Sequence, residues 1–447
     1  MSSTVISAFM AVFATVGTAL ASPVDTSLRP KARPGGAEVT AVADTQATIY
    51  AGLAKSVRPL ARPNDLETDD VEPVSTSNAA FDRWVGGFRG RALAQGISPR
   101  VFDAAFQNAR YTPDVIAKDR NQTEFKSNIW DYLDNAAAPP KVEEGQQAIR
   151  RHNSTLQRIE QHYGVDKEVV AAVWGLESRY GTRMGSYPMV DALATLAFDG
   201  RRGSFFEKQL VTALKIVQSG DVTLRDFKGS WAGAMGHTQF IPTSYMAYAV
   251  DFDGDGRRDV WSRDPGDALA STAAYLRRFG WITGQPWGVE VRVPRGLGNT
   301  GGQRMPSQWA QLGVVGMDGQ PVRDYGSASL LMPAGRNGAA FLVFKNFSVI
   351  KRYNNSDAYA LGVGHLSDRL KGGPPIQGPW PRGYEPLSFN EKMELQRLLK
   401  RDGFPLEKID GLIGSNTRTA IAAFQRSAGM NPDGNPSQEV LKRLKGR

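Results

Sequence analysis

The chain has 447 residues, 41% of them hydrophobic and 22% charged, which is typical of soluble globular proteins and favours two or three domains. It contains no cysteine, so disulfides, thiolate metal sites, a cysteine nucleophile and a cysteine-linked lipid anchor are excluded. The net charge of +9 favours an acidic partner. No dense Lys/Arg run with interleaved aromatic residues occurs, which disfavours nucleic acid.

The amino-terminal region predicts export. An apolar run over residues 5–20 is short for a membrane span and ends in small residues, so we predict a cleaved secretory signal over 1–22. This implies a periplasmic or secreted protein with no stable membrane anchor. The usual basic start is missing, since no Lys or Arg precedes Arg29. Residues 23–79 are rich in Pro, Ala and Thr without a sustained period, which predicts a disordered linker.

Residues 80–371 predict a large helix-rich domain. Apolar residues recur at helical spacing from Phe81, from Ser98, around Ile129, from Ile149, and over 205–218, 267–279 and 357–371. Within this domain, alternation over 289–293 and an apolar run over 341–344 predict strands. We therefore expect a small β-rich lobe at about 286–345.

One predicted helix carries a carboxylate on its apolar face. Asp166 can cap it, and apolar residues recur at three- and four-residue spacing up to Trp174. One further step along this stripe reaches Glu177. Burial there would raise the pKa of Glu177 and let it hold a proton near neutral pH, as a general acid must. An equally weighted alternative is a helix-end glutamate paired with Arg179 or Arg183.

Two segments follow that do not read as ordinary helix. Residues 229–236 are Gly-Ser-Trp-Ala-Gly-Ala-Met-Gly, and so many small residues suggest close approach of backbone or ligand. Residues 251–262 place Asp at loop positions 1, 3, 5 and 9 and Gly at 6, which is the EF-hand calcium pattern. Ser262 replaces the usual Glu at position 12, so Asp264 or, better, Asp267 could complete a longer loop. The predicted ligands of this structural Ca²⁺ are Asp251, Asp253, Asp255, Arg257 through its carbonyl, Asp259 and Asp267.

The carboxyl end predicts a linker and a second unit. Residues 372–385 contain Gly-Gly-Pro-Pro and Gly-Pro-Trp-Pro, and residues 386–447 form the compact unit beyond them. Its predicted helices, 390–401 and 416–428, flank Asp410-Gly411 and a later glycine that suit tight turns. This pattern resembles the three-helix peptidoglycan-binding domain of wall hydrolases. The alternative is a generic helical bundle that ends the chain.

Three separated motifs resemble the lytic murein transglycosylases, and most closely the membrane-bound lytic transglycosylase B family. They are Trp-Gly-Leu-Glu-Ser-Arg-Tyr-Gly (174–181), Gly-Ala-Met-Gly-His-Thr-Gln-Phe-Ile-Pro-Thr-Ser (233–244) and Arg-Tyr-Asn-Asn-Ser (352–356). The resemblance runs from about Phe81 to Leu370. It implies a mainly α (α+β) fold, with a lysozyme-like helical core and a small β-rich lobe.

The resemblance also implies the chemistry. A single glutamate, here Glu177, would protonate the glycosidic oxygen between MurNAc and GlcNAc of peptidoglycan. It would then act as base on the C6 hydroxyl, giving a 1,6-anhydro sugar without water or a catalytic cofactor. A second carboxylate for hydrolysis is not evident, since Asp191 and Asp199 are nearest in sequence but lie in no comparable segment, and Asp191 could simply cap the next helix.

The same resemblance implies polar residues that line the site. They are Ser230, Gln239, Tyr275, Tyr353, Asn354 and Tyr359, with Arg201 and Arg202 facing the peptide or acidic parts of the glycan. Asn354 could hold the acetamido group, and Ser230 and Gln239 could position Glu177 or the sugar. The plainer alternatives are a turn cap for Gln239, a helix-core role for Tyr275 and solvated arginines.

The remaining alternatives concern other classes of protein. No two of the four histidines have zinc-ligand spacing, and His237, inside the glycine-rich motif, is expected near the substrate. A lysozyme- or chitinase-like hydrolase would need a second carboxylate beside Glu177. A non-catalytic wall-binding scaffold would use only the calcium loop and the carboxyl-terminal unit.

Overall fold

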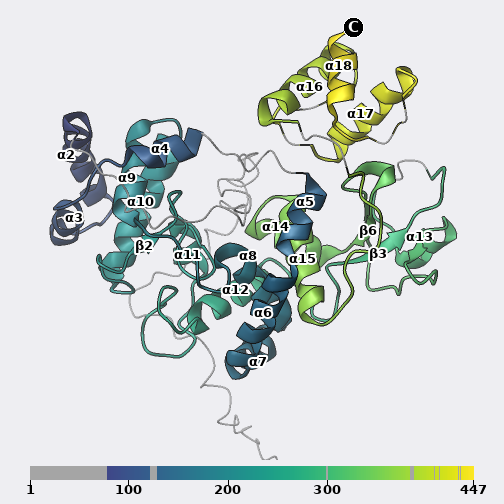
Figure 1. The fold of residues 1–447 in the computed structure, drawn as a ribbon. Helices are drawn as coiled ribbons and strands as arrows, with labels where there is room; N and C mark the ends of the chain where they lie inside the picture. Colours follow the sequence, from purple (N-terminus) through teal and green to yellow (C-terminus); the bar gives the residue numbers. More distant parts are fainter. Residues whose placement is uncertain are drawn as a thin grey trace, which may run out of the picture.

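The computed structural model describes residues 78–120, 128–297, 301–382, 387–406, 408–411, 413–430, 432 and 434–446. The predicted signal peptide and nearly all of the predicted amino-terminal linker lie outside these ranges. The described chain is mainly helical with small antiparallel sheets, so the predicted mainly α (α+β) fold class is confirmed (Figure 1). Within these ranges no helix combines the length and apolarity needed to cross a bilayer.

The first group of helices forms one side of the molecule in Figure 1. Its members are α2 (Ala79–Ala94), α3 (Pro99–Phe106), α4 (Pro113–Arg120), α9 (Met189–Asp199) and α10 (Gly203–Ser219). Stacked and edge-on rings of Phe81, Trp84, Phe88 and Phe198 hold α2 against α9. The predicted cap at Ser98 is present, since its hydroxyl accepts the Val101 N–H at 3.3 Å.

The second group surrounds a central buried helix, α8 (Lys167–Ser178). Packed on it are α6 (Pro139–Arg151), α7 (Asn153–Tyr163), α12 (Gly266–Arg278) and α15 (Asp357–Leu370). Beyond these, α5 (Ile129–Ala136) and α14 (Lys345–Tyr353) pack on α15, and α11 (Pro242–Tyr248) packs on α10 and α12. Every residue from Val169 to Gly175 is buried, so α8 is packed on all sides, with α15 as its most extensive neighbour. Asp166 occupies the predicted N-cap position of α8, but its side chain makes no capping hydrogen bond. Its carboxylate pairs instead with Lys371, which lies 205 residues later in the chain.

The β-rich lobe is a four-stranded antiparallel sheet in the order β4-β3-β6-β5. Its strands are β3 (Gly288–Arg292), β4 (Val315–Gly316), β5 (Ser329–Leu331) and β6 (Ala340–Val343), with α13 (Pro306–Gln311) and the short η2 (Gly335–Asn337) alongside. Val289 pairs with Leu342, and a separate apolar core forms around Trp309. Trp287 joins this lobe to α15, because its indole N–H donates to Asp368 at 2.9 Å. A two-stranded ladder, β1 (Tyr187–Pro188) and β2 (Lys228–Gly229), lies in the helical part.

The carboxyl-terminal unit has its own apolar core. It comprises α16 (Phe389–Arg401), α17 (Ser415–Ser427) and α18 (Gln438–Lys445), which meet at Leu395, Phe424 and Leu441. Gln396, 1% exposed, accepts the N–H groups of Asp410 and Gly411 at 2.9 and 2.7 Å, and so fixes the predicted tight turn. In Figure 1 this unit lies above α5 and the sheet.

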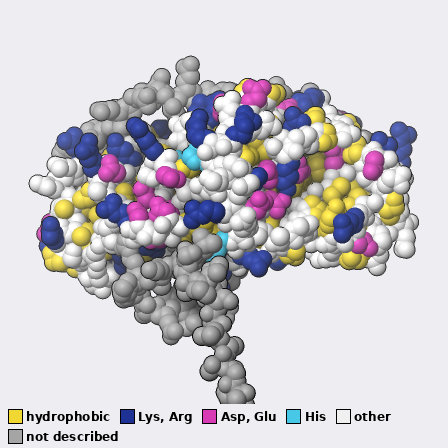
Figure 2. All heavy atoms as spheres, turned by 90° about the horizontal axis from the view of Figure 1, so that it is seen from below, with side chains coloured by type: hydrophobic (Ala, Val, Ile, Leu, Met, Phe, Trp, Pro, Cys, Tyr) yellow, Lys and Arg dark blue, Asp and Glu magenta, His cyan; other side chains and the backbone are white. Residues whose placement is uncertain are grey.

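Charged side chains of both signs are mixed on the face of the molecule that Figure 2 shows. On the face drawn in Figure 2, Lys and Arg side chains alternate with Asp and Glu and with apolar surface, and they do not gather into one basic patch. This agrees with the sequence, in which the positive charge is also distributed.

Candidate active site

Glu177 is the penultimate residue of α8 and is half-buried. The chain reverses directly after it, because Arg179 and Tyr180 adopt left-handed backbone with φ of 47° and 55°. Tyr180 then fits between α6 and α8, where a Cβ on Gly145 or Gly175 would lie 2.2 or 2.6 Å from its side chain. Two consecutive non-glycine residues in this region are uncommon and mark functional turns. The acid is therefore presented at a tightly fixed helix end.

Arg179 does not neutralise Glu177. Its guanidinium makes a bidentate pair with Glu144 of α6, at 2.6 and 2.8 Å. The pairing with Arg179 that the sequence left open is thus wrong, since this cation is committed to another carboxylate.

Tyr359 of α15 contacts the acid directly. Its hydroxyl donates to Glu177 Oε1 at 2.8 Å, and its ring is 2% exposed. The helix that carries it is capped by Ser356, whose hydroxyl accepts the Tyr359 N–H at 3.3 Å. A hydrogen bond from a buried, helix-mounted tyrosine restricts the orientation of the carboxyl group.

Tyr132 is a site residue that the sequence analysis did not single out. Its hydroxyl is buried and has no hydrogen-bond partner among the described residues. Burial raises its pKa, and the charge of Glu177 raises it further. The ring lies against α15, where a Cβ on Gly362 would be 2.9 Å from it. In the sequence, the only feature that could have pointed to Tyr132 is its hydroxyl on the apolar face of a short predicted helix.

The other predicted aromatic residues form a buried group beside Tyr359. The Tyr353 ring stacks parallel to that of Tyr359 at 6.5 Å, and its hydroxyl donates to the Thr238 carbonyl at 2.6 Å. Tyr275 donates to the Arg352 carbonyl at 2.6 Å and is 6% exposed, which agrees with the helix-core alternative. Asn354, 4% exposed, ends α14 in extended backbone. A contact of these residues with a sugar stays a prediction.

Ser230 and Gln239 hold the glycine-rich segment together. Ser230 Oγ accepts the Ala234 N–H at 3.0 Å and closes a turn. Gln239 has left-handed backbone, with φ of 56°, and its side-chain amide donates to the carbonyls of Met184 and Gly236 at 3.0 and 2.8 Å. Both residues shape the backbone of the site, and their contact with Glu177 or the sugar stays a prediction.

Arg201 and Arg202 share a buried partner. Both pair with Asp119 of α4, which is 2% exposed, and the Arg201 contact measures 2.9 Å. Arg202 also lies over the Phe206 ring at 4.9 Å. The Arg201 side chain remains 51% exposed, so a contact with an acidic ligand stays a prediction for it.

The two carboxylates considered as a second catalytic group are engaged elsewhere. Asp199 pairs with Arg120 at 2.7 Å. Asp191 lies in the first turn of α9 and not at its cap, which is Pro188. Burial raises the pKa of Asp191 to about 6, although a hydrogen bond from the Arg110 backbone lowers it in part. Asp199 is thus committed to a cation, and a role of Asp191 as a second catalytic carboxylate stays an alternative for product analysis.

The acidic loop brings its first three carboxylates together. Oxygens of Asp251, Asp253 and Asp255 lie within 4.8 Å of one another. Asp267 holds the base of the loop, accepting the Phe252 and Asp259 N–H groups at 2.8 and 2.9 Å. Burial, with help from the nearby aspartates, raises the pKa of Asp267 to about 7. Closely grouped carboxylate oxygens fit a hard cation such as Ca²⁺. Direct ligation by Asp259, Asp267 and the Arg257 carbonyl stays a prediction.

His237 is not at an open surface where it could meet substrate easily. It is 5% exposed and lies between Trp174 and Ser262. Burial lowers its pKa, which favours the neutral ring.

The comparisons with known proteins agree with this arrangement. Residues 80–368 match the transglycosylase SLT domain family, and residues 390–444 match a peptidoglycan binding domain family. The structure of SltB3 from Pseudomonas aeruginosa in complex with NAG-anhNAM-pentapeptide is 48% identical, with a TM-score of 0.78, over 82% of this chain and 100% of that one.

The matches from Escherichia coli are more distant. Membrane-bound lytic murein transglycosylase B is 36% identical over 54% of this chain, which spans just under two thirds (66%) of that relative's length. Lytic transglycosylase Slt35 in complex with calcium is 31% identical, with a TM-score of 0.56, over 66% of this chain and 93% of that one. The resemblance drawn from the three motifs is confirmed. The chain belongs to the transglycosylase SLT family, with a domain of the peptidoglycan-binding family at its carboxyl end.

Proposed function

We propose that this protein is a lytic transglycosylase of peptidoglycan, and that Glu177 is its single catalytic carboxylate. The observation that carries the proposal is the contact between Glu177 on α8 and the buried hydroxyl of Tyr359 on α15. Membership of the family and the SltB3 complexes with NAG-anhNAM-pentapeptide and NAG-NAM-pentapeptide support the substrate class.

The reaction needs one group that first gives and then takes a proton. Glu177 donates its proton to the glycosidic oxygen between MurNAc and GlcNAc, and the bond from C1 to that oxygen breaks. The carboxylate then takes the proton of the C6 hydroxyl while O6 bonds to C1, which yields the 1,6-anhydro sugar and consumes no water. A carboxyl oxygen accepts hydrogen bonds in both protonation states, so Tyr359 can hold it throughout. The hydroxyl of Tyr132, which is buried and whose pKa the charge of Glu177 raises, is a second phenol near the carboxyl group.

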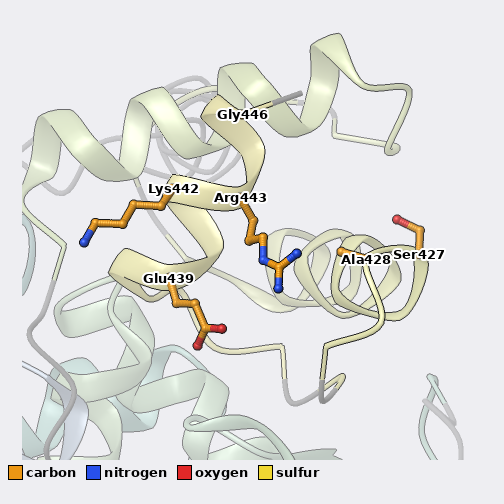
Figure 3. A pocket seen from close by; sticks show the side chains of 6 residues that line it. All are labelled: Ser427, Ala428, Glu439, Lys442, Arg443 and Gly446. Atoms are coloured by element: carbon orange, nitrogen blue, oxygen red, sulfur yellow. The ribbon is translucent and has the colours of Figure 1, made fainter.

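The carboxyl-terminal domain would hold the enzyme on the wall. A hollow of about 530 Å³ lies on it between α17 and α18, lined by Ser427, Ala428, Glu439, Lys442, Arg443 and Gly446. In Figure 3, Arg443 extends toward Ala428, and Lys442 points away from it. This surface is far from Glu177 in sequence, and the domain that carries it has its own apolar core. Both features support wall binding that is independent of cleavage.

The acidic loop would bind a structural Ca²⁺. Asp251, Asp253 and Asp255 would be its first ligands, followed by Asp259, the Arg257 carbonyl and Asp267. The ion would neutralise carboxylates that otherwise repel one another. The Slt35 structure with calcium supports this proposal, and catalysis itself would need no cofactor. With the predicted signal over residues 1–22, the protein would act in the periplasm or outside the cell.

Product analysis tests the function. Purified peptidoglycan digested by the full chain should yield muropeptides with anhydro ends in mass spectrometry. Ordinary reducing ends would indicate a hydrolase, and no products would indicate a scaffold.

Glu177→Gln should abolish turnover without loss of folding, because the amide cannot supply the proton. Glu168→Gln is the matched control, since it makes the same change in the first turn of the same helix. It should retain activity. Substantial turnover by Glu177→Gln would refute the single-acid assignment.

A further inference from the structure

His237 is a buried link between the acidic loop and the end of α8. Its imidazole Nδ1 accepts the indole N–H of Trp174 at 3.1 Å, and its Nε2 lies 2.7 Å from the Ser262 carbonyl. A carbonyl and an indole N–H require opposite roles from the two ring nitrogens. His237 is therefore neutral, with its proton on Nε2.

On the helix side, the residues that His237 contacts lie on both sides of Glu177 in the sequence. Trp174 precedes Glu177 by three residues, and Ser178 follows it directly. Ser178 Oγ donates to the His237 carbonyl at 2.5 Å and accepts the Gly181 N–H at 3.0 Å. The ring also packs on the turn after α8, where a Cβ on Gly181 would lie 2.5 Å from it. His237 thus touches α8 on both sides of Glu177.

On the loop side, hydrogen bonds hold both the His237 backbone and the Ser262 carbonyl that the His237 ring contacts. The His237 N–H donates to the Val260 carbonyl at 2.9 Å. Asp259 accepts the N–H groups of Trp261 and Ser262 at 2.8 and 3.0 Å, which sets the direction of the Ser262 carbonyl. The Asp259 N–H is held in turn by Asp267. Any rearrangement of the acidic loop would therefore move the acceptor of His237.

We propose that His237 is a positioning residue, which couples the order of the acidic loop (residues 251–262) to the orientation of Glu177. An ordered loop fixes the Ser262 carbonyl, the carbonyl fixes the imidazole, and the imidazole fixes Trp174 and the last turn of α8. A cation in the loop then improves the placement of an acid that it does not touch. This inference rests on the proposed role of Glu177 and on the proposed calcium loop.

Two amide substitutions separate the two ends of the link. His237→Asn places an amide near Nδ1, so it keeps an acceptor for Trp174 and loses the donor to Ser262. His237→Gln reaches the Nε2 position, so it keeps that donor and loses the acceptor for Trp174. Trp174→Phe breaks the link from the helix side and also identifies the Trp174 indole signal in NMR spectra of protein labelled with ¹⁵N-tryptophan.

The test measures the Trp174 indole resonance and the kinetics, with Ca²⁺ and after chelation. We expect chelation to shift the resonance in the wild type but in neither His237 variant, because each variant lacks one end of the link. We expect kcat of His237→Asn to fall about tenfold with KM unchanged, because only the placement of the acid is altered. His237→Gln should lose kcat to a similar extent, because Trp174 has no acceptor in that variant.

Some results would overturn the coupling. They are an indole signal that ignores chelation in the wild type, an equal shift in His237→Asn, or wild-type kcat in His237→Asn. If His237→Asn does not fold, Trp174→Phe must show the same loss of kcat with KM unchanged. The NMR arm also works in Glu177→Gln protein, so failure of the coupling is distinguishable from failure of the catalytic assignment.

Discussion

Asp368 should make the protein less stable as the pH rises. It lies on α15, where burial raises its pKa to about 6 from the ordinary 3.8. The hydrogen bond from Trp287 and the charge of Lys371 lower the pKa and offset only part of this shift. Between these two pH values the native state holds a proton that the unfolded chain has released. Stability therefore falls across this window and is lowest above pH 6. At 1.36 kcal/mol for each pH unit, the loss is about 3 kcal/mol.

Asp368→Asn removes this titration and keeps an oxygen that accepts from Trp287. Urea unfolding at pH values from 4 to 7 should show the variant gaining about 3 kcal/mol relative to wild type across the series. Asp318→Asn is the matched control, because Asp318 is exposed and its oxygen accepts the Gln320 N–H. If the unfolding free energies of Asp368→Asn and wild type changed in parallel with pH, the reasoning would be refuted. A variant that loses stability toward pH 7 would mean that Lys371 holds Asp368 ionised.

Three further predictions concern function. Tyr359→Phe removes the donor to Glu177, and the loss of a hydrogen bond to a charged group, about 1.5–3 kcal/mol, should lower kcat about 10- to 100-fold; a change in KM alone would contradict this role. Chelation of Ca²⁺ should lower the melting temperature, and an unchanged value, or the same fall in Asp251→Asn, would argue against the loop as the binding site. Deletion of residues 386–447 should weaken sedimentation with insoluble peptidoglycan and spare cleavage of soluble glycan fragments. Equal loss of both activities would contradict independent domains.

Local sequence patterns predicted the elements better than their contacts. The helical period placed Glu177 on α8, and the strands at 289–293 and 341–344 correspond closely to β3 and β6. Both are short-range signals that a few neighbouring residues determine. The fold class was accessible for the same reason.

The contacts that the sequence did not predict are long-range. Asp166 reads as a helix cap, yet its carboxylate pairs with Lys371 from the other end of the domain. Tyr132 reads as one more apolar contact of a short helix, and only the packing of α5 against α15 brings it beside the acid. His237 reads as a candidate substrate contact, but its buried ring has two protein partners, Trp174 and the Ser262 carbonyl. No local pattern encodes such partners, because they depend on which helices meet.

The contact between Glu177 and Tyr359 joins residues 182 positions apart. Such a contact forms only when a large loop closes, which costs conformational entropy that contacts within one helix do not. A chain that is still being synthesised, or one cut before residue 357, carries the acid but lacks the hydroxyl that holds it. Because such a fragment lacks α15 altogether, full activity would report that the whole helical domain has been completed.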